Sequence, residues 1–318
     1  MIRMLWTAAL AVLAVACTPP QPADSDAPEG TLLSDGLSWA PPAWFPEIAR
    51  ERLWVLDELD GTPIHLRGPR VRARGGILAD LDNGEILWAK DPDGLRPIAS
   101  ITKLVSSLAL ASDGDLDRRL QREICISFEQ WPSRPGARSK FETDDCHDGW
   151  ELLGAALVAS DNRGAYSFPR LTDREYHDFI GRMNEVGREL GFDKATFEDP
   201  SGLEDGNLAS PRDVLKAVTA VSLHPILQIA ASASSWRLDP SRGPRTVRST
   251  NRLLREDWGF DTVAAKTGYT DTAYYCIAAV LQSQASGRRY GAVVLASPKN
   301  RTRFDDVRKL ITWAEEQT

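Results

Sequence analysis

The sequence predicts an α+β fold in which an antiparallel sheet is flanked by helices and carries an inserted all-helical subdomain. Runs typical of β-strands lie near both ends of the chain, and segments with helical periodicity fill the stretch between them. Because strands from the two ends can pair with one another, this order favours one sheet assembled from both termini. The segments between them would form the inserted helical subdomain.

The strands are predicted from alternating apolar residues and turn signals. In "RARGGILADLDNGEILWAKD" apolar residues alternate on both sides of Asp82-Asn83-Gly84, which is typical of a β-hairpin. Three further β-like runs follow near the C-terminus, the last two joined by a Gly-containing turn: "DTVAAKTGYT", "AYYCIAAVLQSQ" and "RRYGAVVLASP". A final amphipathic helix is expected from about residue 303 to 316.

Four helices are expected between the two sets of strands. The first begins in "RPIASITKLVSSLAL", where apolar residues recur at helical spacing. The second, "GWELLGAALVAS", is expected to end near Ser160, and the third, "REYHDFIGRMNEVGRELGF", at Gly191. The fourth, "SPRDVLKAVTAVS", has Ser210 as its predicted N-cap and Pro211 at its first position. The sequence shows no internal repeat.

Length and composition set limits on the class of protein. The chain has 318 residues, of which 26% are charged and 42% hydrophobic, which suits one large or two ordinary domains with a well-formed core. The formal net charge of -7 argues against a nucleic-acid-binding protein. We expect no transmembrane segment in the mature chain.

The N-terminal stretch "MIRMLWTAALAVLAVAC" is typical of an export signal. Arg3 supplies the positive end, an apolar run follows, and small residues precede Cys17. We expect a signal peptide over residues 1–16, a flexible Pro- and Asp-rich tether over 17–50, and one folded domain over 51–318.

The small residues before Cys17 resemble the lipobox of bacterial lipoproteins, although that pattern prefers Leu where this chain has Ala14. The expectation is a lipid anchor on Cys17 that holds the protein on a bacterial membrane, facing the periplasm or cell wall. Cleavage and secretion without lipid is the alternative.

The remaining cysteines are Cys125, Cys146 and Cys276. A disulfide is allowed outside the cytoplasm, and one between Cys125 and Cys146 would close the polar excursion between them. Cys276 lies in the apolar run "YYCIAAVL" and is expected to pack as a small apolar side chain. Because no Cys or His lies at a ligand spacing, we expect neither a metal nor a cofactor.

Three short motifs carry the candidate chemistry. Ser100 and Lys103 form S-x-x-K at the start of a predicted helix, where residues three apart are neighbours. Alone, this pair suggests an N-cap serine and a solvated surface lysine. S-x-N at Ser160 and Asn162 follows a helix, but the same pattern recurs at residues 249–251. K-T-G at 266–268 lies on a predicted strand, and the three motifs together, in this order and these contexts, are a strong signal.

At these motifs the sequence resembles the serine-type D-alanyl-D-alanine carboxypeptidases, the low-molecular-mass penicillin-binding proteins. "PIASITKL" and "KTGYTDTAYYCIAA" carry the resemblance, which runs from about Val71 to Trp313. It implies a β-lactamase/DD-peptidase-like fold. It also implies that Ser100 attacks the penultimate D-Ala of a peptidoglycan stem peptide, that terminal D-Ala leaves, and that β-lactams acylate the same serine.

The residue types suit acyl transfer. A serine hydroxyl is a poor nucleophile until a base takes its proton. Lys103 can be that base only when it is neutral, and burial together with a second cation at Lys266 would lower its pKa. The four histidines lie in no nucleophile motif: His65, His147, His177 and His224.

The resemblance also implies roles for the second and third motifs. Ser160 and Asn162 would relay a proton to the leaving amine and hold the acyl amide, with electrostatic support from Lys266. Thr267, Gly268 and their strand would bind the substrate carboxylate and backbone.

Two further contributions concern the oxyanion and the carboxylate. The backbone N–H groups of Ser100 and Tyr269 would form the oxyanion hole. Arg303 matches an arginine that the family uses near the substrate carboxylate. The alternative for Arg303 is a surface residue at the start of the last helix.

The sequence departs from the family pattern in several places. Val263 and Ala264 stand where members usually carry Asp-Gly, and Arg163 stands where an acidic residue commonly follows S-x-N. These changes could reshape the rim of the pocket. Well-known members add a C-terminal β-rich domain and a membrane helix after the counterpart of "RKLITW", so an N-terminal lipid would replace that anchor.

Three alternative functions remain open. A DD-endopeptidase would use the same residues. A serine β-lactamase of the commonest group needs a glutamate and an asparagine four residues apart, whereas Glu204 and Asn207 are three apart. A non-catalytic peptidoglycan-binding lipoprotein should have lost at least one reacting group, yet all of them are present.

Overall fold

The computed structural model describes residues 42–65, 68–127, 139–239 and 243–317. The predicted signal peptide, Cys17 and most of the predicted tether lie outside the described residues.

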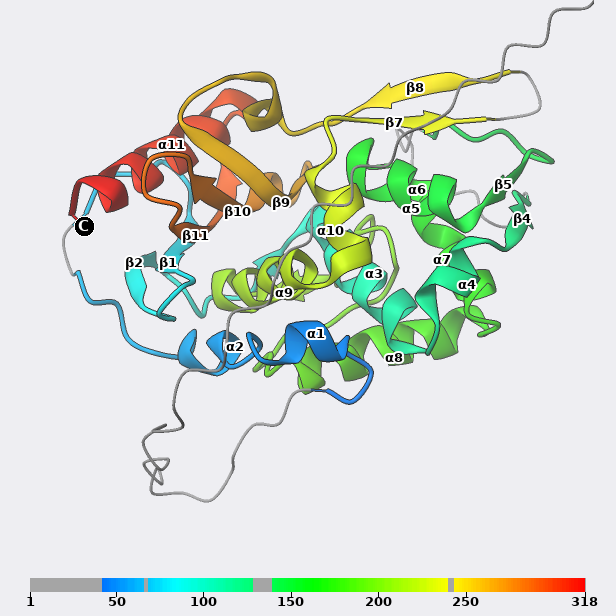
Figure 1. Cartoon of the computed structure of the whole chain (residues 1–318), viewed down its shortest axis with the longest axis horizontal. Coiled ribbons are helices and arrows are strands. Elements are labelled where there is room, and N and C mark those ends of the chain that lie inside the picture. The colour runs from blue at the N-terminus through cyan, green and yellow to red at the C-terminus, as the bar shows by residue number, and fades with distance from the viewer. Residues whose placement is uncertain (1–41, 66–67, 128–138, 240–242, 318) are drawn as a thin grey trace, which may run out of the picture. The chain divides into compact units, whose positions relative to one another are not determined.

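A five-stranded antiparallel sheet forms one side of the folded unit (Figure 1). Its order is β2-β1-β11-β10-β9, so strands from both ends of the chain pair as predicted. The strands are β1 (Gly75–Asp80), β2 (Ile86–Lys90), β9 (Phe260–Thr270), β10 (Tyr274–Ser283) and β11 (Arg289–Ser297). β9, which carries the K-T-G motif, is an edge strand of this sheet, and its outer edge faces the helical part of the unit.

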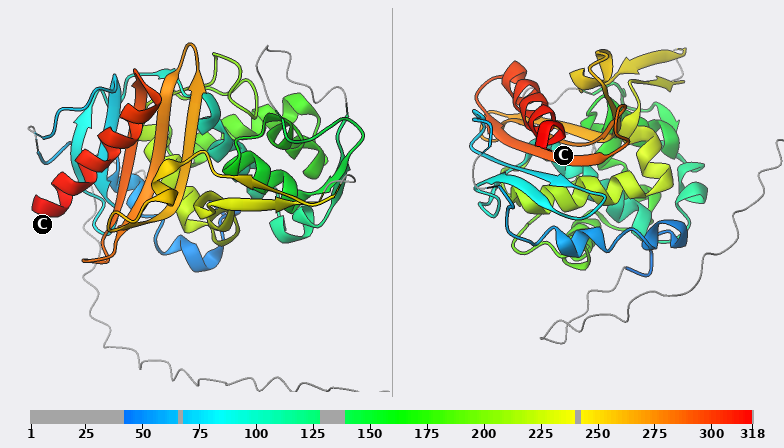
Figure 2. Two further views of the ribbon diagram at one scale, coloured as in Figure 1. Left: turned by 90° about the horizontal axis from the view of Figure 1, so that it is seen from above. Right: turned by 60° about the vertical axis from the view of Figure 1, so that its left-hand side comes forward.

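Helices cover both faces of the sheet (Figure 2). α11 (Asn300–Gln317) packs on one face, where its apolar residues join those of the sheet in one core cluster. It begins three residues earlier than expected. The other face packs against the long helix α9 (Pro211–Leu223), which begins with the predicted Ser210 cap and Pro211.

The inserted part is mainly helical. It contains α3 (Thr102–Ser112), α4 (Leu116–Leu120), α5 (Gly149–Val158), α6 (Asn162–Tyr166), α7 (Phe168–Leu171), α8 (Tyr176–Glu189) and α10 (Pro225–Ser232). It also holds short two-stranded pairs, so it is not all-helical as expected: β3 (Arg96–Pro97) with β6 (Leu208–Ala209), β4 (Glu123–Cys125) with β5 (Cys146–Asp148), and β7 (Ser235–Leu238) with β8 (Arg245–Arg248). Segments this short carry too few residues for a clear periodicity.

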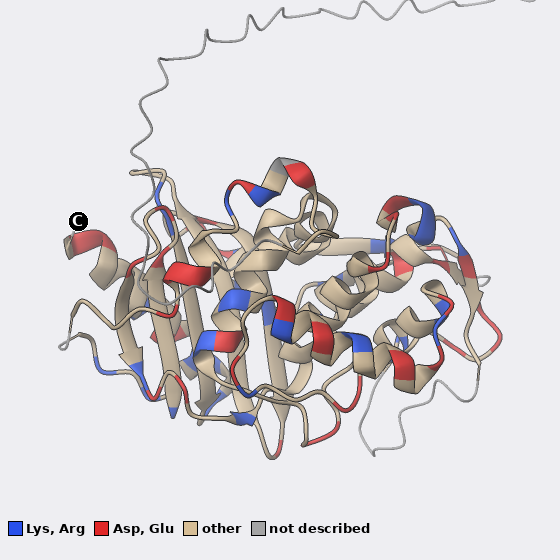
Figure 3. Ribbon diagram, turned by 90° about the horizontal axis from the view of Figure 1, so that it is seen from below, with Lys and Arg blue, Asp and Glu red and all other residues tan. Residues whose placement is uncertain are grey.

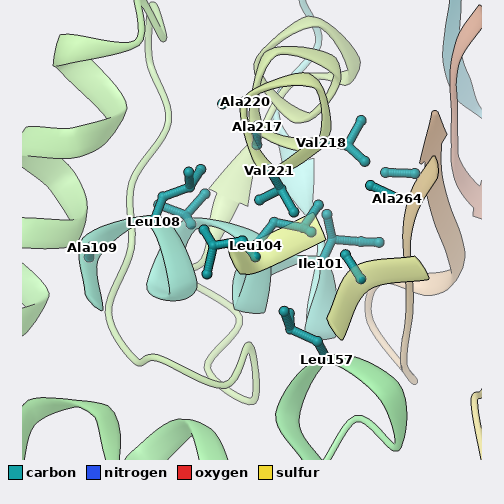
Figure 4. Packing of buried hydrophobic residues seen from close by; sticks show 14 of the residues in the cluster. Ile101, Leu104, Leu108, Ala109, Leu157, Ala217, Val218, Ala220, Val221 and Ala264 are labelled. Carbon is teal, nitrogen blue, oxygen red and sulfur yellow. The ribbon is translucent and has the colours of Figure 1, made fainter. Parts of the chain in front are cut away.

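α3 is the central helix, and every one of its residues is buried. Ile101, Leu104 and Leu108 pack beside Val218 and Val221 of α9 (Figure 4). Ala264 of β9 and Leu157 of α5 reach the same cluster (Figure 4). The S-x-x-K motif is therefore built at the end of an element that is fixed from all sides.

Residues before the predicted domain boundary also belong to the folded unit. Phe45 is 1% exposed in the core, and Trp44 Nε1 donates a hydrogen bond to Glu189 of α8. α1 (Glu47–Arg50) and α2 (Val55–Glu58) follow. The folded unit therefore starts before residue 51, because aromatic residues in this proline-rich stretch reach the core.

Figure 3 shows basic and acidic residues interspersed along the helices and strands. In the described part of the chain, no single helix has both the length and the apolar composition of a membrane span. α9 and α10 meet that test only as a pair bent by 106°.

Candidate active site

Ser100 and Lys103 face each other at the start of α3. Ser100 lies in a 3-10 turn, Ala99–Ile101, and Ile101 is the N-cap of α3 without a side-chain cap bond. Lys103 is 0% exposed, and its Nζ lies 2.9 Å from Ser100 Oγ. The pair is therefore neither an N-cap nor a solvated surface lysine.

Two residues in or next to the first two motifs have strained backbone conformations. Ala99 has φ 49° and Ser160 has φ 61°, both in the left-handed region that costs a non-glycine residue about 1–3 kcal/mol. Both adjoin or belong to a motif that carries chemistry. The surrounding packing must fix these conformations, since neither residue favours them intrinsically.

Strand β9 lies directly against the backbone of the nucleophile. A Cβ on Gly268 would lie 2.7 Å from Ile98 O and 3.1 Å from Ser100 N. Only a glycine allows this approach. It brings the Ser100 amide next to the strand segment that continues into Tyr269, as the expected oxyanion hole requires.

Lys103 Nζ has three oxygen partners. It lies 2.8 Å from Asn162 Oδ1, 2.7 Å from the carbonyl of Ser201 and 2.9 Å from Ser100 Oγ. A neutral amine has two N–H groups and one lone pair. Because a carbonyl or amide oxygen can only accept, the first two partners take the N–H groups and the lone pair faces the Ser100 hydroxyl.

Burial lowers the pKa of both lysines in the site. It lowers the pKa of Lys103 to about 7, and the negative charges of Asp199 and Asp161 work against that shift. Burial also lowers the pKa of Lys266 well below its ordinary value, and repulsion from Lys103 and Arg303 adds to the effect. A neutral Lys103 is therefore accessible near pH 7.

The second motif joins the other two. Ser160 Oγ accepts a hydrogen bond of 2.8 Å from Lys266 Nζ, and Asn162 contacts Lys103. Between them, Asp161 is the N-cap of α6 and accepts from the Gly164 amide. This short motif thus places the Ser160 hydroxyl against Lys266 and the amide oxygen of Asn162 against Lys103.

The repeated S-x-N pattern at residues 249–251 flanks a residue that the sequence did not single out. Thr250 Oγ1 lies 2.6 Å from Thr267 Oγ1, and the Thr250 amide donates to the carbonyl of Val158. Ser249 and Asn251 are buried and shape this turn, since Ser249 Oγ accepts from Asn251 N and Asn251 Oδ1 from Leu253 N. Nothing in the local sequence marks Thr250, because its place depends on how β8 returns to β9.

Arg303 is buried beneath the sheet rather than exposed at a helix start. It is 6% exposed, and Nη1 donates to the carbonyls of Gly268 (2.8 Å) and Cys276 (3.0 Å). In a planar trans peptide the N–H points opposite to the carbonyl, so fixing the Gly268 carbonyl also fixes the Tyr269 N–H. The surface alternative is wrong. Burial lowers the pKa of Arg303 to about 10.

The departures from the family pattern have structural explanations. Arg163 is 1% exposed and donates to the Phe141 carbonyl (2.9 Å) and to Thr143 Oγ1 (3.1 Å). It therefore ties the second motif to the excursion, which a Cys125–Cys146 disulfide closes. Val263 packs against the core beside the buried Ala264, and Cys276 is a free, buried thiol.

A turn at residues 199–207 also reaches the site and was missed. Ser201 contributes the carbonyl that contacts Lys103, and the buried Asp199 organises the turn. Asn207 is 0% exposed, and its Nδ2 donates to Asp199 (2.6 Å) and to the Glu204 carbonyl (3.0 Å). The signal in the sequence was "DPSGLEDGN", in which Asp, Pro, Ser and Gly are turn residues.

Taken together, a serine beside a buried lysine, a second serine–lysine pair and an amide side chain define a serine enzyme of acyl transfer. Comparison with known proteins gives the particular family. The family model described as D-alanyl-D-alanine carboxypeptidase matches residues 63–299. The chain belongs to this family, and it is a serine hydrolase that acts on D-Ala-D-Ala peptides.

Individual relatives and solved structures agree with this assignment. The chain is 28% identical over 252 residues to a D-alanyl-D-alanine endopeptidase of Escherichia coli, covering 78% of each chain. It is 25% identical over 247 residues to the D-alanyl-D-alanine carboxypeptidase DacF of Bacillus subtilis, covering 77% of this chain and 62% of that one. A solved D-alanyl-D-alanine carboxypeptidase from Mycobacterium tuberculosis shares the fold, with a TM-score of 0.71, 20% identity, and coverage of 81% and 96%.

Proposed function

We propose that this protein removes the terminal D-Ala of peptidoglycan stem peptides through an ester on Ser100, with Lys103 as the base. The observation that supports this most directly is the distance of 2.9 Å between Lys103 Nζ and Ser100 Oγ inside a buried site. A hydrogen bond of this length lets the proton pass when the hydroxyl oxygen attacks.

In the first half of the reaction, Ser100 Oγ bonds to the carbonyl carbon of the penultimate D-Ala as its proton moves to Lys103. The negative oxygen is held by the N–H groups of Ser100 and Tyr269, the latter fixed through Arg303. The C–N bond then breaks, and the departing amine takes the proton held by Lys103, passed on through Ser160, whose hydroxyl Lys266 holds by a hydrogen bond. Lys103 is then neutral again. Terminal D-Ala leaves.

In the second half, water adds to the ester carbon and the bond to Ser100 Oγ breaks. Lys103 takes a proton from the water and delivers it to Ser100 Oγ as that bond breaks, which restores the free serine and the neutral amine. Asn162 would hold the amide of the acyl group, and Thr267 on the edge strand β9 would bind the substrate carboxylate together with Lys266. No metal or cofactor is required for these steps.

Two measurements test this proposal. Incubation with a labelled penicillin should give an adduct whose mass maps to Ser100, and incubation with a stem pentapeptide should remove one alanine. The lifetime of the adduct separates two functions. We expect the slow decay of a carboxypeptidase, whereas rapid release of the penicillin would indicate a β-lactamase. A protein that forms no adduct and leaves the pentapeptide intact would contradict the proposal.

DD-endopeptidase activity is the second candidate, and the names of the relatives favour it. Proteins named D-alanyl-D-alanine endopeptidase from Escherichia coli, Pseudomonas aeruginosa and Haemophilus influenzae are 26–28% identical to this chain. A cross-linked peptide dimer offered beside the pentapeptide separates the two activities. Faster cleavage of the dimer would assign the endopeptidase role.

We also propose that the protein is exported and held on a bacterial membrane by a lipid on Cys17, facing the periplasm or cell wall. The N-terminal sequence supports this, with Arg3, an apolar run and small residues before the cysteine. Metabolic labelling with palmitate should mark the wild-type protein and leave Cys17→Ala unlabelled. Equal labelling of both would contradict the proposal.

A further inference from the structure

A buried carboxylate organises the turn at residues 199–207 beside the site. Asp199 is 0% exposed, and its Oδ1 accepts from Ser201 N (2.6 Å), Ser201 Oγ (2.7 Å) and Gly202 N (2.9 Å). Its Oδ2 accepts from Glu204 N and Asn207 Nδ2, both at 2.6 Å. All five donors are neutral groups of the turn itself, so this one side chain holds the turn together.

The turn touches both reacting residues at the start of α3, Ser100 through its backbone and Lys103 through its amine. The carbonyl of Ser201 accepts from Lys103 Nζ at 2.7 Å. Gly202 has φ 83°, and a Cβ there would lie 1.9 Å from Ala99 O and 2.9 Å from Ser100 N. The turn is therefore packed against the peptide that carries the nucleophile, and a displacement of the turn would move both groups relative to each other.

Charged groups reach Lys103 from three elements. Asp199 approaches from the turn, Asp161 from the start of α6 and Lys266 from β9. The two carboxylates raise the pKa of Lys103, Asp199 more strongly, against the lowering by burial. Tyr166, also near Asp199, has its pKa raised to about 12 by burial and stays neutral.

We propose that Asp199 is a positioning residue of the peptidase reaction, which holds the Ser201 carbonyl against Lys103 so that the amine's lone pair stays directed at Ser100. Resting on the proposed function, this inference takes Lys103 as the base. A neutral amine needs both of its acceptors, Asn162 and the Ser201 carbonyl, to fix its rotation about the Cε–Nζ bond. The charge of Asp199 additionally sets the pH range in which the amine is neutral.

The test compares Asp199→Asn and Asp199→Glu with the wild type in the rate of acylation by a fluorescent penicillin, measured across the neutral pH range. The donors of the turn bond both oxygens of the Asp199 carboxylate. An asparagine side chain has only one acceptor oxygen, so some of these hydrogen bonds are lost and the turn shifts. We expect a loss of about 10²-fold, the scale for a misplaced reacting group. Because the negative charge is lost, the fall in rate at low pH should move to lower pH. Asp199→Glu keeps the charge, so its rate should fall while the position of that pH transition stays.

A matched control is Asp213→Asn. Asp213 is a similarly buried carboxylate that accepts from Ser210 N, Ser210 Oγ and Asp193 N, but it caps α9 and has no bond to Lys103. This variant should lose stability and keep the wild-type rate and pH profile per folded molecule.

The outcomes separate the inference from the function on which it rests. A folded Asp199→Asn with the wild-type rate and pH profile would overturn the inference. If that variant does not fold, Asp199→Glu decides, and a wild-type rate in it overturns the inference equally. Failure of the proposed function would instead appear as a wild-type protein without an adduct on Ser100.

Discussion

Two helices of this protein begin with a serine followed three residues later by a charged side chain. At α9, Ser210 and Asp213 form a capping box in which each side chain bonds the other residue's backbone N–H. At α3, Ser100 caps nothing and its hydroxyl contacts Lys103 instead. One spacing thus gives a structural device at one helix and a reactive pair at the other.

The difference lies in what each helix start is packed against. A capping box satisfies backbone N–H groups and contributes about 0.5–2 kcal/mol. The start of α3 gives up that contribution and places Ala99 in the left-handed region, with φ 49°. Its stability comes from the complete burial of the helix, and the N–H of Ser100 just before it is one of the two donors of the proposed oxyanion hole.

The largest effect is expected from Ser100→Ala. Removal of the nucleophile should abolish the penicillin adduct and reduce turnover by a factor on the order of 10⁶, as in other serine hydrolases. Mass spectrometry after labelling and a D-Ala release assay measure both. The control is Ser210→Ala, which should label normally. Near-normal turnover by Ser100→Ala would make the nucleophile assignment wrong.

The second largest effect is expected from replacing Lys103, the proposed base. Lys103→Met keeps the length of the side chain but removes the base, so acylation should slow by about 10²- to 10⁴-fold. The control is Lys216→Met. Lys216 is also buried, but it pairs with Asp60 at 2.8 Å and lies outside the site, so its loss should lower stability alone. Equal labelling by Lys103→Met and wild type would exclude Lys103 as the base.

The change in the wild-type acylation rate with pH should be smaller than the effects of these two substitutions. Only the neutral amine can take the proton from Ser100, and burial sets the pKa of Lys103 to about 7. The rate should therefore rise with pH through about 7 and level off above it, falling about tenfold for each pH unit below. Stopped-flow labelling over a pH series measures this, and a flat profile through pH 7 would contradict a titrating base.

The smallest effect concerns the capped helix. Ser210→Ala removes one half of the capping box, so the free energy of unfolding should fall by about 0.5–2 kcal/mol. Urea unfolding of the wild type and the variant gives the difference. A loss of acylation in the folded variant would show that the two helix starts are not separate devices.

Much of the fold could be predicted because its signals are local. Alternation around Asp82-Asn83-Gly84 gave the hairpin of β1 and β2, and the cap at Ser210 gave the start of α9. Short elements such as α6 and α7 carry too few residues for a periodicity. The role of Thr250 and of the Asp199 turn could not be predicted, since both depend on contacts between segments far apart in the chain.

The sequence by itself determined which groups are present and in what order: S-x-x-K, S-x-N and K-T-G, with the glycine that lets β9 approach Ser100. Only the tertiary structure decided that Lys103 is buried among three oxygens and that Arg303 lies beneath the sheet. The physical reason is that motifs are properties of neighbouring residues. The pKa of an amine depends on solvent exclusion and on charges that distant segments bring to it.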